Sequence, residues 1–360
     1  MKKTDNIQND QKEKQPRGRK LKQAVKRKRS AKTAPDGEQP ITVEVETVDP
    51  IWVDDDFKML ATSIFPRMYR APFGGDGGRY YFREGFKDFY SGYSLWTHSV
   101  LPTNPGLMKW KMQMGEKGEL ISLLAREYGS IFHLHVARHE RPDDEFRFKF
   151  HGPQSLNWRD HIWQTINHLG VGRQYGDQWE SQLRNDFMAY FRWKQFHLVN
   201  VLAVEVPLFD DRFKIATPGD MIIQCNIKKS PYAKEATEPA IVGVDFKTGE
   251  SGVDFDEYKL QLEFMRHAWN QRFAGTKYEM THVFNWHPKH RKLSPAGFNF
   301  VDQGGKYTLQ QFKHLARTNA VMGYNRPGGK VLVYRDGENE FDADLEIITP
   351  YKWLKEFFKK

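Results

Sequence analysis

The sequence has little cysteine and no long hydrophobic run. Cys225 is the only cysteine among 360 residues, and one thiol can make neither an internal disulfide nor an iron–sulfur cluster. No apolar run approaches the roughly 20 residues that a membrane-spanning helix requires, and the N-terminus lacks the hydrophobic region of a secretion signal. We therefore expect a cytoplasmic protein with no iron–sulfur cluster and no membrane attachment.

Most of the chain also lacks an excess of charge of either sign. Residues 1–33 hold 13 Lys/Arg and 3 Asp/Glu, a net charge of +10, whereas the other 42 basic and 43 acidic residues nearly cancel. A basic segment without apolar periodicity is typical of a disordered tail. We interpret residues 1–40 in this way, and such a tail raises nonspecific affinity for nucleic acid through counterion release.

The order of predicted elements after the tail indicates an α/β (mixed) fold. Helices are predicted near 115–132, 156–169, 178–197, 254–273 and 309–322, and strands at 41–49, 198–208, 209–217, 221–227, 240–246, 283–286 and 297–301. This order predicts a small central mixed sheet flanked by helices. We divide the chain into the tail, an aromatic and glycine-rich portion, a core and a C-terminal extension packed on it, at residues 1–40, 41–110, 111–290 and 291–360. The glycines of 74–78 follow no strand and open no helix, so they predict no nucleotide-binding loop.

Residues 218–249 place three reactive side chains near one another. They read as two short β-branched strands joined by a polar loop. Asp245 and Lys247 share one face of the second strand while Phe246 points to the other, and pairing of the strands brings Asp220 beside Asp245. Two adjacent carboxylates repel each other, which a divalent cation relieves. The trio therefore predicts metal-dependent hydrolysis of a phosphodiester, with the lysine stabilising developing negative charge.

The acid-x-Lys pattern by itself carries little information. It also occurs at Asp10, Asp56 and Glu257, where a solvated surface pair is the simpler interpretation. Only Asp245 ends an apolar strand, precedes a Thr-Gly pair and follows an upstream Gly-Asp turn. Of the four acid-x-Lys occurrences, we therefore assign a catalytic role only to the one at Asp245.

An ordered set of motifs over residues 94–270 resembles the RecB-like branch of the PD-(D/E)XK nuclease superfamily, phage and prophage exonucleases above all. The motifs, in chain order, are Ser94–Leu101 (SLWTHSVL), Leu107–Trp110 (LMKW), Gly129-x-x-x-His133, Val204–Leu208 (VEVPL), Pro218–Asp220 (PGD), Asp245–Gly249 (DFKTG) and Tyr258-x-x-Gln261. The resemblance implies a restriction-endonuclease-like core and, for a phage-encoded protein, a bacterial host cell as its location.

The resemblance also implies a metal site. By position in the motifs, His133, Asp220 and Asp245 would bind Mg²⁺ or Mn²⁺, and the backbone carbonyl of Phe246 would add a ligand. Lys247 would orient the attacking water and stabilise charge on the phosphate.

Two further parts of the site follow from the same resemblance. Glu205 matches the acid that precedes the metal aspartate, where it binds a metal or holds the site electrostatically. Gln261 matches a helix glutamine that contacts DNA phosphate. The family pattern on this helix is usually Gln-x-x-x-Tyr, but position 265 is Met; Tyr258, one turn earlier on the same stripe, is the substitute that we expect.

Simpler roles remain open for several of these residues. His133 can be a structural histidine, Glu205 a buried salt-bridge partner and Gln261 an exposed helix residue. We expect His135 and His139 on the surface or facing DNA. The polar segment between the two catalytic strands, residues 228–239, is expected to be a surface loop.

The sequence thus predicts a Mg²⁺- or Mn²⁺-dependent deoxyribonuclease, with an exonuclease acting on DNA ends in recombination or replication as the favoured role. A structure-specific endonuclease, a non-catalytic nucleic-acid-binding protein on the same fold and an RNA-binding protein driven by the tail are the alternatives. DNA is the expected partner, together with a recombination or single-strand-binding protein, and an oligomer is compatible with a processive enzyme. Polarity, strand preference and the number of metals are not encoded in these motifs.

Overall fold

The computed structural model describes most of the chain from residue 65 onward. The described residues are 65, 68–71, 79–83, 88–101, 105–140, 157–227, 239–249, 255–289, 296–321, 331–334, 345–348, 352 and 354–355. All of them belong to one unit that spans residues 49–360. The basic tail, the strand predicted at 41–49, the glycines of 74–78 and most of the predicted loop 228–239 lie outside the described residues.

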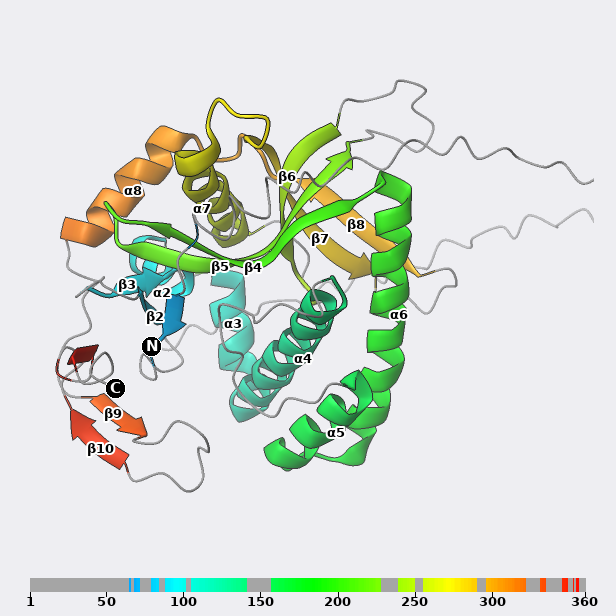
Figure 1. The fold of residues 1–360 in the computed structure, drawn as a ribbon. Helices are drawn as coiled ribbons and strands as arrows, with labels where there is room; N and C mark the ends of the chain where they lie inside the picture. Colours follow the sequence, from blue (N-terminus) through cyan, green and yellow to red (C-terminus); the bar gives the residue numbers. More distant parts are fainter. Residues whose placement is uncertain are drawn as a thin grey trace, which may run out of the picture. The chain divides into compact units, whose positions relative to one another are not determined.

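The described residues form a mixed α/β fold, as predicted (Figure 1). The helices are α2 (Tyr93–Val100), α3 (Pro105–Met114), α4 (Glu116–Glu140), α5 (Trp158–Leu169), α6 (Arg173–His197), α7 (Asp256–Phe273) and α8 (Leu309–Val321). The strands are β1 (Met68–Arg70), β2 (Tyr80–Arg83), β3 (Tyr90–Gly92), β4 (Asn200–Asp210), β5 (Ile215–Asn226), β6 (Pro239–Phe246), β7 (Met280–Lys289), β8 (Gly297–Asp302), β9 (Val331–Tyr334) and β10 (Leu345–Ile348). No helix among the described residues has the length and apolar character needed to cross a lipid bilayer.

The central sheet has eight strands, more than the small sheet that the sequence predicts. Its order is β1-β2-β3-β5-β6-β7-β8, with β4 paired to β5. The β3–β5 and β6–β7 pairs are parallel and the others antiparallel. The additional strands β1–β3 have only three or four residues each, which is too short for an alternating pattern to be read. Strands β9 and β10 form a separate antiparallel pair.

Strand β5 is longer than expected and spans two strands that the sequence separates. The strand predicted at 209–217 contains the end of β4, a turn at 211–214 and the start of β5. Strand β5 then continues as one 12-residue strand through most of the strand predicted at 221–227, paired with β4 from Ile215 to Gln224. Pro218 and Gly219, which look like a turn in the sequence, lie inside it. Proline is tolerated there because, among the described residues, no strand pairs with the other side of β5 at this point: β3 pairs with Ile215 and Ala216, and pairing with β6 begins at Met221.

The sheet therefore forks beside residues 217–220. Strand β3 leaves β5 after Ala216 and continues into α2, while the end of β6 approaches from the opposite direction. Ends of strands at such a divergence leave backbone and side chains available for a ligand, as at the switch points of open α/β sheets.

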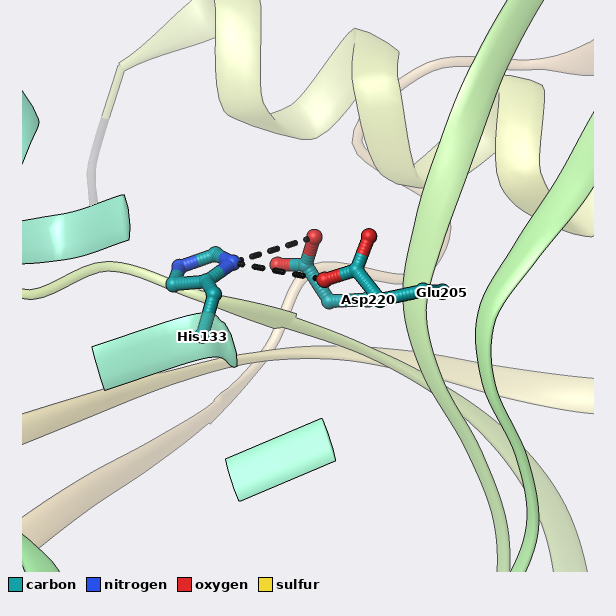
Figure 2. Close-up of side chains that lie close together, drawn as sticks. All are labelled: His133, Glu205 and Asp220. Atoms are coloured by element: carbon teal, nitrogen blue, oxygen red, sulfur yellow. Dashed lines mark ion pairs between the residues drawn. The ribbon is translucent and has the colours of Figure 1, made fainter. Parts of the chain in front are cut away.

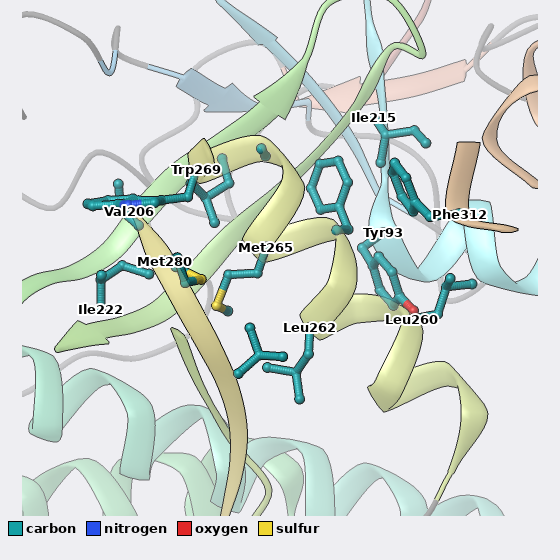
Figure 3. Packing of buried hydrophobic residues seen from close by; sticks show 14 of the residues in the cluster. Tyr93, Val206, Ile215, Ile222, Leu260, Leu262, Met265, Trp269, Met280 and Phe312 are labelled. Carbon is teal, nitrogen blue, oxygen red and sulfur yellow. The ribbon is translucent and has the colours of Figure 1, made fainter. Parts of the chain in front are cut away.

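Helices cover both faces of the sheet. One core contains residues of α2, α7 and α8, and the other contains residues of α4, α5 and α6. Along β5, Ile222 joins the first core, whereas Met221 and Ile223 join the second, as the two-residue period of a strand requires. Figure 3 shows the first core, where Met265 and Trp269 of α7 pack against the strands.

The packing of α7 onto the sheet depends on a glycine in β6. A Cβ on Gly243 would lie 2.6 Å from the sulfur of Met265 and 2.8 Å from that of Met280. Met265 is fully buried in this contact. Met265 is thus a core residue that fills the space above Gly243.

Candidate active site

The two predicted catalytic strands bring Asp220 and Asp245 to the fork. Strands β5 and β6 are antiparallel with Met221 opposite Val244, so Asp220 and Asp245 are the next residues on the two strands. The Oδ2 atom of Asp220 accepts a hydrogen bond of 2.7 Å from the backbone N–H of Phe246. This bond spans the place where the β5–β6 ladder has ended, and it holds the carboxylate of Asp220 against the tip of β6.

Three potential metal ligands meet beside this tip. The Nδ1 atom of His133 lies 3.5 Å from Oδ1 of Asp220 and 3.9 Å from Oε1 of Glu205. The ligand atoms of the three residues all lie within 4.8 Å of one another. Figure 2 shows the imidazole of His133 turned toward both carboxylates, which extend from neighbouring strands. Side chains from α4, β4 and β5 therefore converge on one point.

A glycine on α4 brings His133 to the sheet. Gly129 lies one helical turn before His133, and a Cβ there would lie 3.0 Å from the Oγ1 atom of Thr248. A methyl group there would already make a tight contact, and a larger side chain would require Thr248 or α4 to shift. The glycine and histidine of the Gly-x-x-x-His motif thus have linked roles. Gly129 permits α4 to lie close to Thr248, and His133 then reaches the carboxylates at the sheet.

Glu205 reaches the cluster from a strained backbone. Its φ is +46° although it lies in the middle of β4, flanked by the pairs Val204↔Met221 and Val206↔Gly219. The left-handed region costs a non-glycine residue roughly 1–2 kcal/mol, and such residues concentrate at functional sites. The left-handed conformation interrupts the β4–β5 register at Glu205, which lies opposite Asp220.

The electrostatics of the cluster are dominated by the proximity of its two carboxylates and the imidazole. Burial and the nearby carboxylate of Asp220 raise the pKa of Glu205 to about 8. Burial disfavours the imidazolium of His133, but Asp220 and Glu205 outweigh it and raise the pKa of His133 to about 9. Burial likewise opposes ionisation of Asp220, yet His133 and Lys247 hold its pKa below the ordinary value. Crowded carboxylates that share a proton or a protonated histidine are the arrangement that a divalent cation relieves.

Asp245 and Lys247 form a second group at the same tip. The Nζ atom of Lys247 lies 2.7 Å from Oδ1 and 2.6 Å from Oδ2 of Asp245. Burial raises the pKa of Asp245 to about 6, with Lys247 opposing and Asp220 adding to the rise. Burial lowers the pKa of Lys247, but Asp245 and Tyr258 outweigh it, so its pKa lies above the ordinary value. Lys247 is therefore a permanent positive charge at neutral pH.

Helix α7 contributes the residues that hold the lysine. The Nζ atom of Lys247 donates a 3.2 Å hydrogen bond to Oε1 of Gln261 and lies 4.4 Å from the ring centre of Tyr258, a cation–π distance. Both helix residues are half-buried. The structure thus places Tyr258 and Gln261, expected as DNA contacts, in direct contact with Lys247.

The predicted metal ligands are arranged differently from the expected set. The compact cluster contains Glu205 together with His133 and Asp220, whereas Asp245 is engaged by Lys247. The side chain of Phe246 points to the opposite face, where its ring packs edge-on against Trp286.

One surface prediction is wrong. His135 is 8% exposed, and its Nε2 atom lies 3.2 Å from Nδ1 of His161 on α5. Burial lowers the pKa of His135 to about 4, and His161 acts in the same direction. His135 lies two residues after His133 and so faces the helices instead of the sheet edge. His139 is exposed, as expected.

Sequence reasoning missed two polar residues of β7 at this site. Asn285 donates a 2.6 Å hydrogen bond from Nδ2 to Oδ2 of Asp245, and the Nδ1 atom of His287 lies 2.6 Å from the backbone carbonyl of Lys247. Both are buried. The available signal was the alternation of polar and large apolar residues in residues 283–287 (VFNWH), which places Asn285 and His287 on one face of the strand.

The donor set fits a hard divalent cation. Two carboxylates supply oxygen ligands of the type that Mg²⁺ and Mn²⁺ prefer, and an imidazole nitrogen is a common additional ligand for a transition metal. The three ligands leave positions for water or a substrate oxygen, as a catalytic metal site requires. No protein-family model matches this chain, and a comparison with curated proteins finds no match.

Proposed function

We propose that this protein is a Mg²⁺- or Mn²⁺-dependent DNA nuclease of the PD-(D/E)XK type, favouring DNA ends as an exonuclease. The observation that supports the proposal is the meeting, at the fork of the sheet, of the His133–Glu205–Asp220 cluster with the Asp245–Lys247 pair. The fork thus brings carboxylates that can bind a cation close to the fixed ammonium group of Lys247. Together these two elements can catalyse hydrolysis of a phosphodiester.

The residues have distinct roles in this proposal. The cluster of His133, Glu205 and Asp220, together with the neighbouring carboxylate of Asp245, would hold the cation, which would supply Lewis acidity toward a phosphate oxygen and lower the pKa of water. Lys247 stays protonated, so it serves as a positive charge and hydrogen-bond donor to the attacking oxygen and the phosphate, and a role as general base is disfavoured.

The residues around Lys247 restrict where its charge points. Asp245 holds the ammonium through close contacts with both carboxylate oxygens, while Gln261 and Tyr258 hold it from α7. Such pre-organisation avoids reorganisation when charge develops on the phosphate. The amide nitrogen of Gln261 is the group on α7 best suited to donate to a phosphate oxygen, because its Oε1 already accepts from Lys247.

A positive side chain lies on the other side of the fork. Arg79 acts electrostatically on Glu205, and its backbone carbonyl accepts a hydrogen bond from the N–H of Gly92, the residue that precedes α2. Arg79 is exposed. We assign it to binding of the DNA backbone, a contact that positions the duplex without reading its sequence.

The test is cleavage by the purified protein of end-labelled linear duplex and of closed circular DNA, with Mn²⁺ or with EDTA. Lys247→Ala removes the fixed ammonium, and Lys259→Ala, which removes the lysine of α7 that pairs with Asp256 at 3.2 Å, is the matched control. Metal-dependent loss of linear DNA alone, abolished by Lys247→Ala and kept by Lys259→Ala, supports the exonuclease. Cutting of the circular DNA shows an endonuclease. If the protein binds DNA but cleaves none of the linear, circular, single-stranded and branched substrates, the catalytic assignment is refuted.

A further inference from the structure

The end of β7 lies against the tip of β6 and makes three hydrogen bonds to it. The register places Asp245 beside Asn285 and Phe246 beside Trp286 in a parallel pair. Asn285 donates to the carboxylate of Asp245, the carbonyl of Trp286 accepts from the N–H of Lys247 at 2.9 Å, and the imidazole of His287 reaches the carbonyl of Lys247. Both residues that carry the Asp-x-Lys chemistry are therefore held by one strand.

The side chain of Asn285 is poorly explained by stability alone. It is 0% exposed, and its Oδ1 atom has no hydrogen-bond partner among the described residues. Burying an amide oxygen without a partner is unfavourable, and Val283, two residues earlier on the same face of β7, shows that this face accommodates a buried apolar side chain. The favourable contact of Asn285 is the 2.6 Å bond to Oδ2 of Asp245.

That bond fixes the orientation of the Asp245 carboxylate. Oδ2 accepts from Asn285, and both oxygens contact Lys247. A carboxylate with donors on both sides cannot rotate freely about its last torsion, so its remaining lone pairs keep one direction.

His287 acts on the backbone of Lys247. The bond at 2.6 Å requires a hydrogen on Nδ1, because a carbonyl oxygen can only accept. With the N–H of Lys247 bonded to Trp286 and its carbonyl bonded to His287, the peptide groups on both sides of Lys247 are anchored. The side chain then leaves the backbone at a fixed point just beyond the last residue of β6.

We propose that Asn285 and His287 are positioning residues of the active site: Asn285 orients the carboxylate of Asp245, and His287 anchors the backbone that presents Lys247. This inference rests on the proposed nuclease function. It goes beyond that function in assigning to β7, which carries none of the recognised motifs, a role in metal affinity and turnover.

The two residues have separable effects. In Asn285→Leu, which keeps the approximate size, we expect the Mn²⁺ dissociation constant to rise about 10- to 100-fold, the range for partners of metal-binding groups, together with a lower kcat. Asn285→Asp keeps the shape but faces one carboxylate with another, so it is expected to behave at least as badly. In His287→Leu we expect a similar fall in kcat with unchanged Mn²⁺ affinity, because Lys247 is not a ligand. His287→Asn, whose Nδ2 can replace the Nδ1 donor, is expected to restore most of the turnover.

The matched control is Asn270→Leu. The side-chain amide of Asn270 donates to the carbonyl of Met280 at 3.0 Å and accepts from its N–H at 2.8 Å, so its bonds stabilise the start of β7 and not its end at the site. We expect this change to lower the unfolding temperature and to leave Mn²⁺ affinity and kcat unaltered. Binding of Mn²⁺ is measured on the full-length proteins by electron paramagnetic resonance of the free ion, which needs no activity, and kcat and KM by cleavage of linear duplex.

The outcomes distinguish failure of the positioning roles from failure of the proposed nuclease function. Normal Mn²⁺ affinity and kcat in folded Asn285→Leu, or equal defects in Asn270→Leu, refute the positioning role while the nuclease assignment stands. Loss of activity in both His287→Leu and His287→Asn without any recovery refutes the role of the Nδ1 donor. A wild-type protein that neither binds Mn²⁺ nor cleaves DNA refutes the nuclease, and the positioning role with it.

Discussion

Glu205→Gln should make the metal-free protein more stable at neutral pH while weakening its binding of Mn²⁺. The substitution keeps the shape of the side chain and removes its charge. Glu205 is 6% exposed, and burial together with Asp220 raises its pKa from 4.5 to about 8. The wild-type protein therefore sacrifices stability at this position for the ability to present a carboxylate at the site.

The sign of the effect follows from the protons that each state binds. Between pH 4.5 and 8 the unfolded chain has lost the proton of Glu205 and the folded protein has kept it, so stability falls as pH rises across this window. One pH unit corresponds to about 1.4 kcal/mol, which gives a penalty of about 3 kcal/mol at pH 7. His133 acts in the same direction: its pKa is raised to about 9, so its stabilising contribution is complete below pH 6.5 and is lost as pH rises through 9.

The assay is urea unfolding followed by tryptophan fluorescence at pH 5, 7 and 9, in EDTA and in Mn²⁺. Without metal, we expect wild-type stability to fall from pH 5 to pH 9 and Glu205→Gln to be more stable than wild type by about 2–3 kcal/mol at pH 7. With Mn²⁺, stabilisation of the wild type should increase with pH, because binding needs ionised Glu205 and neutral His133. Stabilisation of Glu205→Gln should be much smaller.

A second buried glutamate provides the control. Glu263 is 3% exposed and pairs with Arg266 at 2.7 Å, so Glu263→Gln should lower stability and leave the Mn²⁺ effect intact. If Glu205→Gln proved less stable than wild type at pH 7 in EDTA, or kept the full stabilisation by Mn²⁺, the proposed electrostatics of the cluster would be wrong.

Three further predictions test the packing around the site and the role of the tail. Gly129→Val should weaken Mn²⁺ binding, measured by electron paramagnetic resonance, because its side chain would displace α4 from Thr248, which lies 3.0 Å from the position of a Cβ; unchanged affinity would contradict the link between the glycine and His133. Met265→Tyr, which introduces the tyrosine expected from the resemblance, should lower the free energy of unfolding by about 1–3 kcal/mol in urea because the site is fully buried above Gly243. A gain in cleavage rate would show that position 265 faces the substrate. Removing residues 1–33, which hold 13 basic residues, should reduce the salt dependence of DNA affinity in a binding titration while metal-dependent cleavage persists; complete loss of DNA affinity would favour a protein that binds nucleic acid through its tail.

Local patterns in the sequence were sufficient for the main elements of the fold. The periodicity of Leu124, Tyr128 and Phe132 predicted α4, and the apolar run before Asp245 predicted β6. Alternation along β6 also predicted that Asp245 and Lys247 share a face, which their contact at 2.6 Å confirms. These features are set by neighbours a few residues apart, so a short window of sequence contains them.

Other features depend on partners distant in the chain. Pro218 and Gly219 read as a turn, but pairing with β4 on one side and the absence of a ladder on the other keep them inside one strand. Met265 lies on the predicted stripe with Gln261, yet the space above Gly243 decides that it is a core residue. His135 is buried because α5 supplies His161.

What the sequence determined by itself is the chemistry that is available: two aspartates and a lysine beside one another at the end of a strand pair, and a glycine one turn before a histidine. What only the tertiary structure decided is which of these groups meet. The fork of the sheet and the left-handed backbone of Glu205 bring Glu205 together with His133 and Asp220. The bonds from β7 hold Asp245, which contacts Lys247 and Asn285. Such grouping depends on distances between elements that are far apart in the chain, and those distances are set by how the helices and strands pack.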